Sequence, residues 1–254
     1  MNTDNITAYL ERIGYRGPLD ASVETLCGLH LAHLYSVPFE NLDIISGRPI
    51  ALGNAELFDK IVTRRRGGFC YELNGIFSAL LAELGFRVTM LSAEVAREAG
   101  GFSPEFDHLA LRVDLDEPWL ADVGFGDGFR VPLNLTDDAE QEQDGRLYRI
   151  DPINMDGEYR VLLRRDPDGW TSQYRLTLRP RALEDFAERC RFHQTSPESH
   201  FTRGRICTLA TPEGRITLSD LRLIVTTGLQ GTERRLAAEA EYAAVLRQTF
   251  GVIE

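Results

Sequence analysis

The sequence predicts an α+β fold in three parts: a helical first third, a central antiparallel sheet or small barrel, and a mixed end. Apolar residues recur with a helical period through the first third of the chain. From Phe86 the period changes to two, and turn residues separate short alternating segments. Helical and alternating segments mix after Pro180. We expect a division into residues 1–85, 86–195 and 196–254, with layers that share one cleft.

Three amphipathic helices are expected in the first part. Asp20 or Ser22 can cap the first helix, and Asn54 can cap the second. The third begins at Cys70 and ends before Gly85. Its apolar residues follow a clear helical period: Leu73, Ile76, Phe77, Leu80, Leu81 and Leu84. Cys70 therefore lies in the first turn of this helix, on its buried face.

Alternation and turn chemistry predict the strands of the second part. The expected strands are RVTMLSAEV, HLALRVDL, PWLADVGFG, LYRID, EYRVLLRRD and GWTSQYRLTL. Beyond them, a helix through Phe186 and Cys190 leads to a hairpin that turns at Pro212–Gly214. A last helix is expected to be capped near Thr232.

Charge and hydropathy exclude several classes of function. The net charge of −11 repels phosphate polymers and anionic membranes at long range, and Arg64–Arg66 is the one basic run. No apolar run approaches the roughly 20 residues that span a bilayer. The first residues, MNTDNITAYL, lack the basic and apolar regions of a secretory signal, so we expect a cytoplasmic protein.

The four cysteines do not form a metal-binding pattern. Cys27, Cys70, Cys190 and Cys207 show neither C-x-x-C pairing nor Cys/His ligand spacing. We expect no metal, and free thiols in a reducing compartment.

Cys70 differs from the other three because it opens a helix. A helix N-terminus carries a partial positive charge and free N–H groups, which favour a thiolate. Gly67 and Gly68, just before it, permit a close approach of backbone to substrate. A simply buried core thiol is the alternative, because free cysteines are often buried.

A cysteine nucleophile needs a base and a group that orients the base. HLALRVDLDEPWLADVG contains two alternating segments that can form a hairpin. A turn centred near Leu115 would place His108 opposite Asp122, whereas a turn on Asp116 and Glu117 would make the pair diagonal and weaker. Asp122 lies among apolar residues and needs a partner, either His108 or a local arginine. The other four histidines offer no comparable pattern: His30, His33, His193 and His200.

Five segments together resemble the arylamine N-acetyltransferases: VPFENLDI, RGGFCYELN, DHLALRV, LADVGFGDG and FHQTSPESHF. They occur in the family's order across most of the chain. The resemblance implies an N-terminal helical bundle, a central antiparallel β-barrel and a C-terminal α/β lid, with a core similar to papain-like cysteine enzymes. It also implies a catalytic triad of Cys70, His108 and Asp122.

The implied activity is acetyl transfer from acetyl-CoA to an arylamine, arylhydrazine or hydrazide. The mechanism would be ping-pong, through an acetyl-cysteine at Cys70. The expected partners are therefore the acyl donor and a small-molecule acceptor, without nucleic acid or membrane, and the chain would be a monomer or a homodimer. Because the net charge is negative, we expect few strong contacts to the phosphates of CoA.

Further residues carry roles by resemblance alone. Arg66 and Glu40 match a structural ion pair that would brace the start of the helix. Asn74 would form a hydrogen bond near the site, although an amide on the helix surface is the alternative.

The pocket residues implied by the resemblance are aromatic. Phe39 and Phe125 match positions that line the acceptor pocket, with plain core packing as the alternative. Phe125 and Gly126 would also lie near the acyl-CoA entrance. Asp107 departs from the small or hydroxyl residue expected there, and its carboxylate would raise the pKa of His108 or repel an anionic donor.

Three other functions are compatible with the same residues. The fold resemblance extends to amide synthases that close a polyketide macrolactam. A Cys-His-Asp triad also serves cysteine hydrolases. A binding module would keep the residues for packing only.

Overall fold

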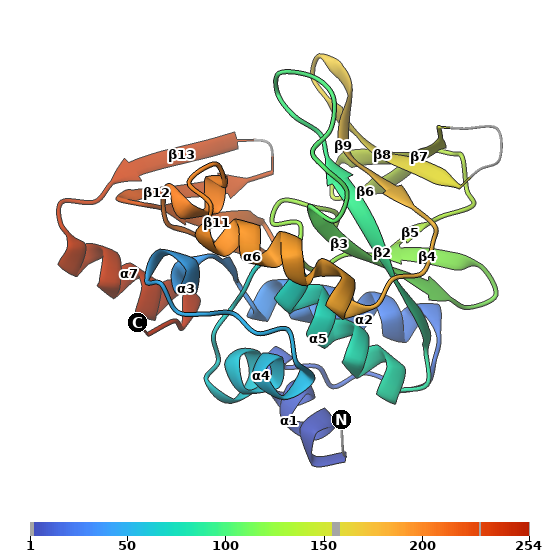
Figure 1. The fold of residues 1–254 in the computed structure, drawn as a ribbon, viewed down its shortest axis with the longest axis horizontal. Helices are drawn as coiled ribbons and strands as arrows, with labels where there is room; N and C mark the ends of the chain where they lie inside the picture. Colours follow the sequence, from blue (N-terminus) through green and yellow to red (C-terminus); the bar gives the residue numbers. More distant parts are fainter. Residues whose placement is uncertain (1–2, 154–157, 229, 254) are drawn as a thin grey trace.

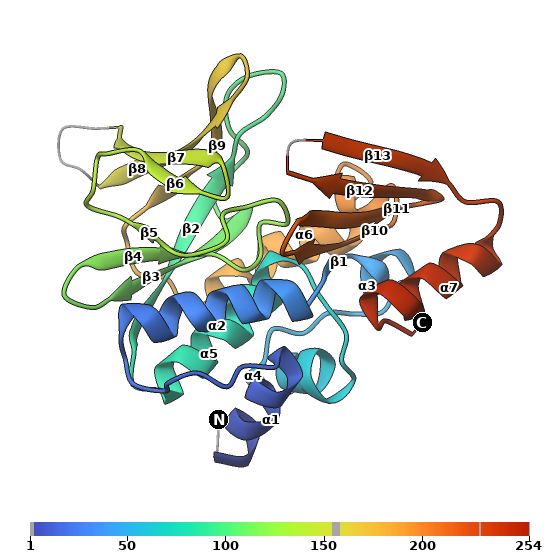
Figure 2. The ribbon, with the colours of Figure 1, turned by 180° about the vertical axis from the view of Figure 1, so that it is seen from behind.

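A computed structural model describes residues 3–153, 158–228 and 230–253. A layer of helices lies beneath two sheets that stand side by side, and α6 (Ala187–Thr195) runs between these parts (Figures 1 and 2). The predicted α+β class is confirmed: N-terminal helices precede a nearly closed eight-stranded antiparallel barrel and a C-terminal sheet. No helix in the described ranges is both long and apolar enough to cross a membrane.

The helical layer contains α1 (Thr3–Ile13), α2 (Val23–Ser36), α3 (Leu42–Ile45), α4 (Asn54–Phe58), the π-helix η1 (Asp59–Thr63) and α5 (Cys70–Glu83). Three helices of this layer lie where they were predicted, whereas α1 and α3 were not predicted. The predicted cap at Asn54 is wrong, because Gly53 holds the cap position and Asn54 is the first residue of α4. Ser22 caps α2, because its Oγ accepts a hydrogen bond from the Thr25 N–H at 3.3 Å. Gly85 follows α5 with a φ of 89°, a conformation that glycine adopts without strain.

The eight strands of the barrel pair in the order β5-β4-β3-β2-β9-β8-β7-β6. They are β2 (Arg87–Val95), β3 (His108–Asp114), β4 (Pro118–Ala121), β5 (Leu133–Asn134), β6 (Gln141–Gln143), β7 (Arg146–Pro152), β8 (Tyr159–Asp166) and β9 (Gly169–Thr177). The short strands β5 and β6 were not predicted.

Glutamine side chains bridge the two edges of the barrel. Gln143 Oε1 accepts hydrogen bonds from the N–H groups of Arg130 and Val131, at 2.9 and 3.0 Å. Its Nε2 donates to the Val131 carbonyl at 2.8 Å. Gln141 makes a similar pair of bonds to the backbone of Asn134. These bonds satisfy backbone groups that would otherwise lie open at a sheet edge.

The C-terminal sheet has the order β1-β10-β11-β12-β13. It consists of β1 (Phe39–Glu40), β10 (Ile206–Thr211), β11 (Gly214–Ser219), β12 (Arg222–Thr227) and β13 (Gln230–Arg235), and it is followed by α7 (Glu239–Phe250). Two 3-10 helices, η2 (Leu183–Phe186) and η3 (His200–Thr202), flank α6. The predicted helix cap near Thr232 is wrong, because Thr232 pairs with Val225 in an exposed charged edge strand that has no apolar alternation.

One apolar core joins the first two parts. Ile76 and Leu80 of α5 belong to the same buried cluster as Leu109 and Leu111 of β3. Full burial of each such side chain stabilises the fold by about 2 kcal/mol. The helix that begins at Cys70 is thereby fixed against the strand that begins with His108. The exact division at residues 85 and 195 stays a prediction.

Candidate active site

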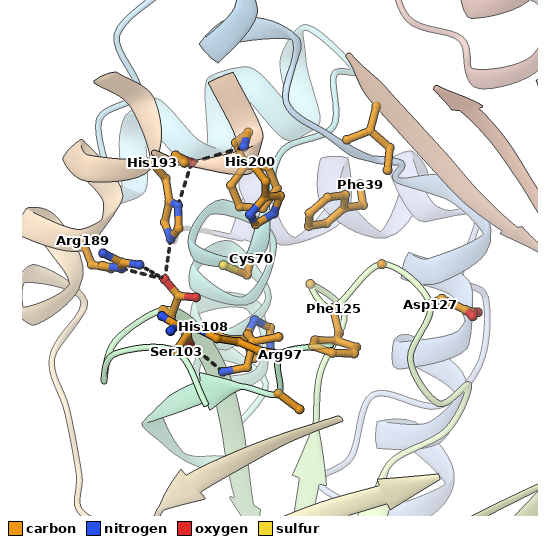
Figure 3. Close-up of a pocket in the computed structure, with 18 of the residues that line it drawn as sticks. Phe39, Cys70, Arg97, Ser103, His108, Phe125, Asp127, Arg189, His193 and His200 are labelled. Atoms are coloured by element: carbon orange, nitrogen blue, oxygen red, sulfur yellow. Dashed lines mark hydrogen bonds and ion pairs between the residues drawn. The ribbon is translucent and has the colours of Figure 1, made fainter. Parts of the chain in front are cut away.

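A cavity of about 800 Å³ lies where the three parts of the chain meet. Phe39 from β1, Cys70 from α5, His108 from β3 and Thr217 from β11 all line it. Cys70 occupies the middle of this view of the cavity, with Arg189 and Asp127 toward its two sides (Figure 3). The structure therefore brings the predicted nucleophile and base to one wall.

Buried ion pairs hold the segment that precedes Cys70. Arg66 binds Glu40 at 2.8 Å and Asp43 at 3.2 Å. Lys60 in turn bridges Asp43 and Glu72, at 2.8 Å each. The predicted contact between Arg66 and Glu40 is thus present, and it extends into a network of five charged side chains. Such pairs are costly to break from one side, about 3–5 kcal/mol, because a buried charge is left without a partner.

The network ends on the helix that carries Cys70. Glu72 Oε2 accepts a hydrogen bond from the Phe69 N–H at 3.1 Å, so a residue of the first turn caps its own helix. The ion pairs therefore fix where α5 begins and which way its first turn faces.

His108 and Asp122 form a hydrogen bond of 2.7 Å between Nε2 and Oδ2. The direct register with a turn near Leu115 is not formed, and the alternative with a shifted turn is observed. Leu111 pairs with Ala121 and Asp114 with Pro118, so the turn is shifted toward Asp116 and the His108–Asp122 pair is diagonal. Pro118 cannot donate a ladder bond and begins the strand, which sets this register. Asp122 lies just past the end of β4 and still reaches the imidazole.

Four hydrogen bonds hold the buried Asp122 carboxylate. His108 and the Tyr174 hydroxyl donate to Oδ2, at 2.7 and 3.0 Å. The Asn74 amide and the Gly124 N–H donate to Oδ1, at 2.8 and 2.9 Å. Burial alone would raise the pKa of Asp122, but the charge and hydrogen bond of His108, with the other donors, lower it. The carboxylate is therefore ionised.

Asn74 is part of the site and not a surface amide. Besides Asp122, its Nδ2 donates to the Leu109 carbonyl at 2.6 Å, and its Oδ1 accepts from the Val123 N–H at 2.9 Å. It ties α5 to both strands that carry the His108–Asp122 pair.

Two residues that hold Asp122 had no signal in the sequence. Tyr174 comes from β9, and His30 from α2 accepts the Asp122 N–H on Nε2 at 3.1 Å. His30 Nδ1 donates to the Arg130 carbonyl at 2.8 Å, and burial lowers the pKa of His30 to about 4, against the opposing effects of Arg130 and Asp122. His30 is therefore a neutral side chain that positions the backbone of Asp122 and Arg130.

The hydrogen bond to Asp122 assigns the tautomer of His108. An ionised carboxylate only accepts, so the Nε2 of His108 carries the proton and Nδ1 is the ring nitrogen left to act as a base. The backbone N–H of Leu109, the next residue, forms a hydrogen bond to the Cys70 sulfur.

Cys70 lies in an environment that opposes an isolated thiolate. Burial raises the pKa of its thiol well above the usual value, and the charges of Asp122 and Asp107 raise it further, whereas the Leu109 N–H lowers it. Burial therefore opposes the effect of the helix N-terminus, which was expected to favour the thiolate. A thiolate here requires a cation close by.

Asp107 does not act on the site as an isolated charge. Its Oδ1 accepts from His193 Nε2 at 2.9 Å and from Arg189 Nε at 2.6 Å. Burial opposes ionisation, but His193, Ser103 and Arg189 together hold the pKa of Asp107 far below its usual value. The contact with His193 was not predicted. The expected repulsion of an anionic donor is weakened because Arg189 balances the charge.

Aromatic side chains line the cavity beside the predicted nucleophile. Phe39 and Phe125 both face it, as expected, and Gly126 lies next to Phe125 with a φ of 85°. The Phe125 ring packs edge-on against His108, with 5.2 Å between the ring centroids. The ring centroids of Phe201, from η3, and Phe39 lie 6.1 Å apart. These rings suit a flat aromatic ligand.

Comparison with known proteins decides the family. The sequence model of a family described as N-acetyltransferase matches residues 22–253. The arylamine N-acetyltransferase of Escherichia coli is 33% identical to this chain over 98% of the chain and 89% of its own length. The chain belongs to the arylamine N-acetyltransferase family of enzymes.

Solved arylamine N-acetyltransferases have the same fold. The enzyme from Salmonella typhimurium is similar with a TM-score of 0.93 and 30% identity, covering 99% of this chain and 92% of the other. The Mycobacterium marinum enzyme, solved in complex with CoA, has a TM-score of 0.90 and 33% identity, covering 97% and 92%. The predicted family and class of enzyme are confirmed. Among the described residues, no group of three or more His, Cys, Asp or Glu side chains could hold a metal ion.

Gly124 is expected to be irreplaceable, because its Cα packs on the backbone of Cys70. A Cβ there would lie 2.7 Å from the Cys70 Cα. We expect Gly124→Ala to cost about 1–3 kcal/mol of stability and to reduce acetylation of Cys70 at least tenfold, measured by thermal unfolding and mass spectrometry. Gly128→Ala is the matched control, since its Cβ would meet Phe125 at an ordinary 3.4 Å. Equal behaviour of the two variants would contradict this packing.

Asp107 is expected to make the free energy of unfolding depend on pH. Its folded pKa lies below the ordinary value of 3.8, so its contribution is full above that value and is lost as the pH falls toward the folded pKa. Asp107→Asn should be less stable than wild type at pH 7, and its urea midpoint should fall less between about pH 5 and pH 3. The control is Asp151→Asn, whose partner Arg149 lies on the same strand. If the urea midpoint of Asp107→Asn fell with pH as steeply as that of wild type, the stabilising ion pairs of Asp107 would be contradicted.

Proposed function

We propose that this chain transfers the acetyl group of acetyl-CoA to the nitrogen of an arylamine, arylhydrazine or hydrazide. One observation carries the proposal. Cys70 begins a helix at the wall of a cavity that His108 also lines, and Asp122 holds the Nε2 of His108 at 2.7 Å. This arrangement supports Cys70 as nucleophile, His108 as base and Asp122 as the group that orients the base.

The first half-reaction would load the cysteine. His108 takes the thiol proton on Nδ1, and the resulting imidazolium stabilises the thiolate that burial otherwise disfavours. The thiolate attacks the carbonyl carbon of acetyl-CoA. The bond from that carbon to the CoA sulfur breaks, the CoA sulfur receives the proton from His108, and acetyl-Cys70 remains.

The second half-reaction would transfer the acetyl group to nitrogen. The lone pair of the acceptor attacks the thioester carbonyl and His108 takes a proton from that nitrogen. The bond from carbon to the Cys70 sulfur breaks, and the N-acetylated product leaves. Cys70 recovers its proton from His108, which restores the starting state.

The start of α5 can stabilise the oxyanion in both halves. The first N–H groups of a helix have no intrahelical acceptor, and they point toward a group at its N-terminus. The N–H of Cys70 itself is the nearest such donor to its own sulfur.

The cavity favours aromatic acceptors. Phe39, Phe125 and Phe201 line it close to Cys70, and planar rings pack well against such walls. Its volume of about 800 Å³ falls in the range of sites for small molecules.

Acetylation of Cys70 tests the proposal. Incubation with acetyl-CoA alone should add one acetyl group to Cys70 and release one CoA, and an aromatic amine should then remove the acetyl group. Asp122→Asn should keep the fold and reduce this turnover about 10⁴-fold, because the imidazole loses its assigned tautomer. Intact-protein mass spectrometry and release of free CoA measure both steps.

The controls separate this activity from the alternatives. Cys70→Ala should show no acetylation, and Asp114→Asn, outside the cavity, should behave as wild type. Loss of the acetyl group to water at the same rate with and without amine would favour a hydrolase instead. A wild-type protein that acetyl-CoA does not modify would refute the proposal.

A further inference from the structure

Three arginines from two different parts of the chain converge on one carboxylate beside the cavity. Arg146 and Arg164 of the barrel bind Asp127 at 2.9 and 3.4 Å. Arg215 of the C-terminal sheet binds the same carboxylate at 3.2 Å. Three guanidinium groups therefore share the Asp127 carboxylate.

Arg215 is the buried member of this cluster and lines the cavity. The exposed fraction of Arg215 is 9%. Its Nε donates to Asp127 and its Nη1 to the Thr208 hydroxyl at 3.1 Å, and no described residue accepts from its Nη2. Burial lowers the pKa of Arg215, Asp127 opposes this, and the charges of Arg130 and Arg146 lower it further. Arg215 is thus a buried cation that shares its carboxylate partner with two other arginines, and an added anion would reduce their mutual repulsion.

Other charged groups near the cluster do not neutralise the charge of Arg215. Arg130 donates both Nη groups to the carbonyls of Thr211 and Gly214. Asp166 pairs with Arg164 at 3.1 Å. Asp144 and Glu213 lie on the outer side, where they line a small separate pocket with Arg130 and Arg146. None of the ion pairs among the described residues joins these two carboxylates to Arg215.

The cluster leads outward from the cavity. The Asp127 side chain is 49% exposed, those of Arg146 and Arg164 are 25% and 21% exposed, and that of Arg215 is 11% exposed. Asp127 lies three positions after Gly124, which packs on Cys70, so the Cα atoms of Asp127 and Gly124 are at most about 11 Å apart. A ligand that reacts at Cys70 and extends toward solvent on this side passes the arginines.

The geometry points to a phosphate of the acyl-CoA donor as the anion that Arg215 binds, with Arg146 and Arg164 on its outer side. This inference rests on the proposed function. Guanidinium groups bind phosphate through paired, charge-assisted hydrogen bonds. The Thr208 hydroxyl accepts from Arg215 and contacts the Thr217 hydroxyl at 2.7 Å, and both threonines line the cavity. The expectation of few phosphate contacts, drawn from the net charge, considered the whole molecule and not this local concentration of arginines.

Donors with and without phosphate test the inference. The rate constant for acetylation of Cys70, divided by the half-saturating donor concentration, is measured for acetyl-CoA, acetyl-dephospho-CoA and the phosphate-free thioester S-acetyl-N-acetylcysteamine. Arg215→Gln should lower this ratio about tenfold or more for acetyl-CoA and less than twofold for the phosphate-free thioester. Acetyl-dephospho-CoA identifies the phosphate concerned: the loss persists if it is the pyrophosphate and disappears if it is the 3′-phosphate.

Two further variants keep the test decisive. Arg222→Gln removes the same charge from the same sheet, but Arg222 pairs with Ser219, at the other end of the strand from Arg215. This variant should therefore leave the acetylation ratio unchanged for every donor. Arg146→Gln replaces a partly exposed member of the cluster, and should show the same selective loss if Arg215→Gln does not fold. An equal loss for all three donors, or no loss, overturns the inference. A wild-type protein that no donor acetylates refutes instead the proposed function.

Discussion

The buried carboxylate of Asp122 is the contact on which the rest of the site depends. Its four donors come from α5, β3, the loop after β4 and β9, through Asn74, His108, Gly124 and Tyr174. A buried carboxylate without partners costs several kcal/mol, so each of these elements has to reach its place before the charge is tolerated. Because of this requirement, the helical layer and the barrel meet in one relative position, and that position brings Cys70 and His108 to the same wall.

The same burial sets the chemical problem that the site has to solve. Removal of water raises the pKa of the Cys70 thiol, and the nearby carboxylates raise it further. The partial charge at the helix N-terminus acts against this effect of burial. Under the proposed mechanism, a proton acceptor that becomes a cation beside the sulfur resolves the conflict, and the Nδ1 of His108 would have that task because Asp122 holds Nε2. The charged network from Glu40 to Glu72 then keeps the helix start in place.

The sequence predicted the parts of the site that depend on local patterns. Apolar periodicity located α5 and placed Cys70 at its first residue, and alternation located the hairpin that carries His108 and Asp122. The sequence left two positions for the turn of this hairpin, since alternation does not determine which residue of the loop is central, and the structure has the shifted one. The observed hydrogen bond formed nevertheless, because Asp122 lies beyond the paired part of β4.

Contacts between distant segments could not be predicted from one sequence. Tyr174 and His30 lie 52 and 92 residues from Asp122, and His193 lies 86 residues from Asp107. Their pairing depends on how β9, α2 and α6 pack, and no periodicity in the sequence contains that information. The arginine cluster at Asp127 joins the barrel to the C-terminal sheet in the same way.

The proposed pairing of Cys70 with His108 is tested most directly by the rate at which iodoacetamide alkylates Cys70 at pH 7 in wild type and in His108→Gln. Half-buried Cys27 serves as the reference thiol within the same molecule. We expect alkylation of Cys70 to be about a hundredfold slower or more in the variant, because the thiolate loses its cation, while Cys27 reacts at an unchanged rate. Equal rates at Cys70 in the two proteins would show that its thiolate does not depend on His108.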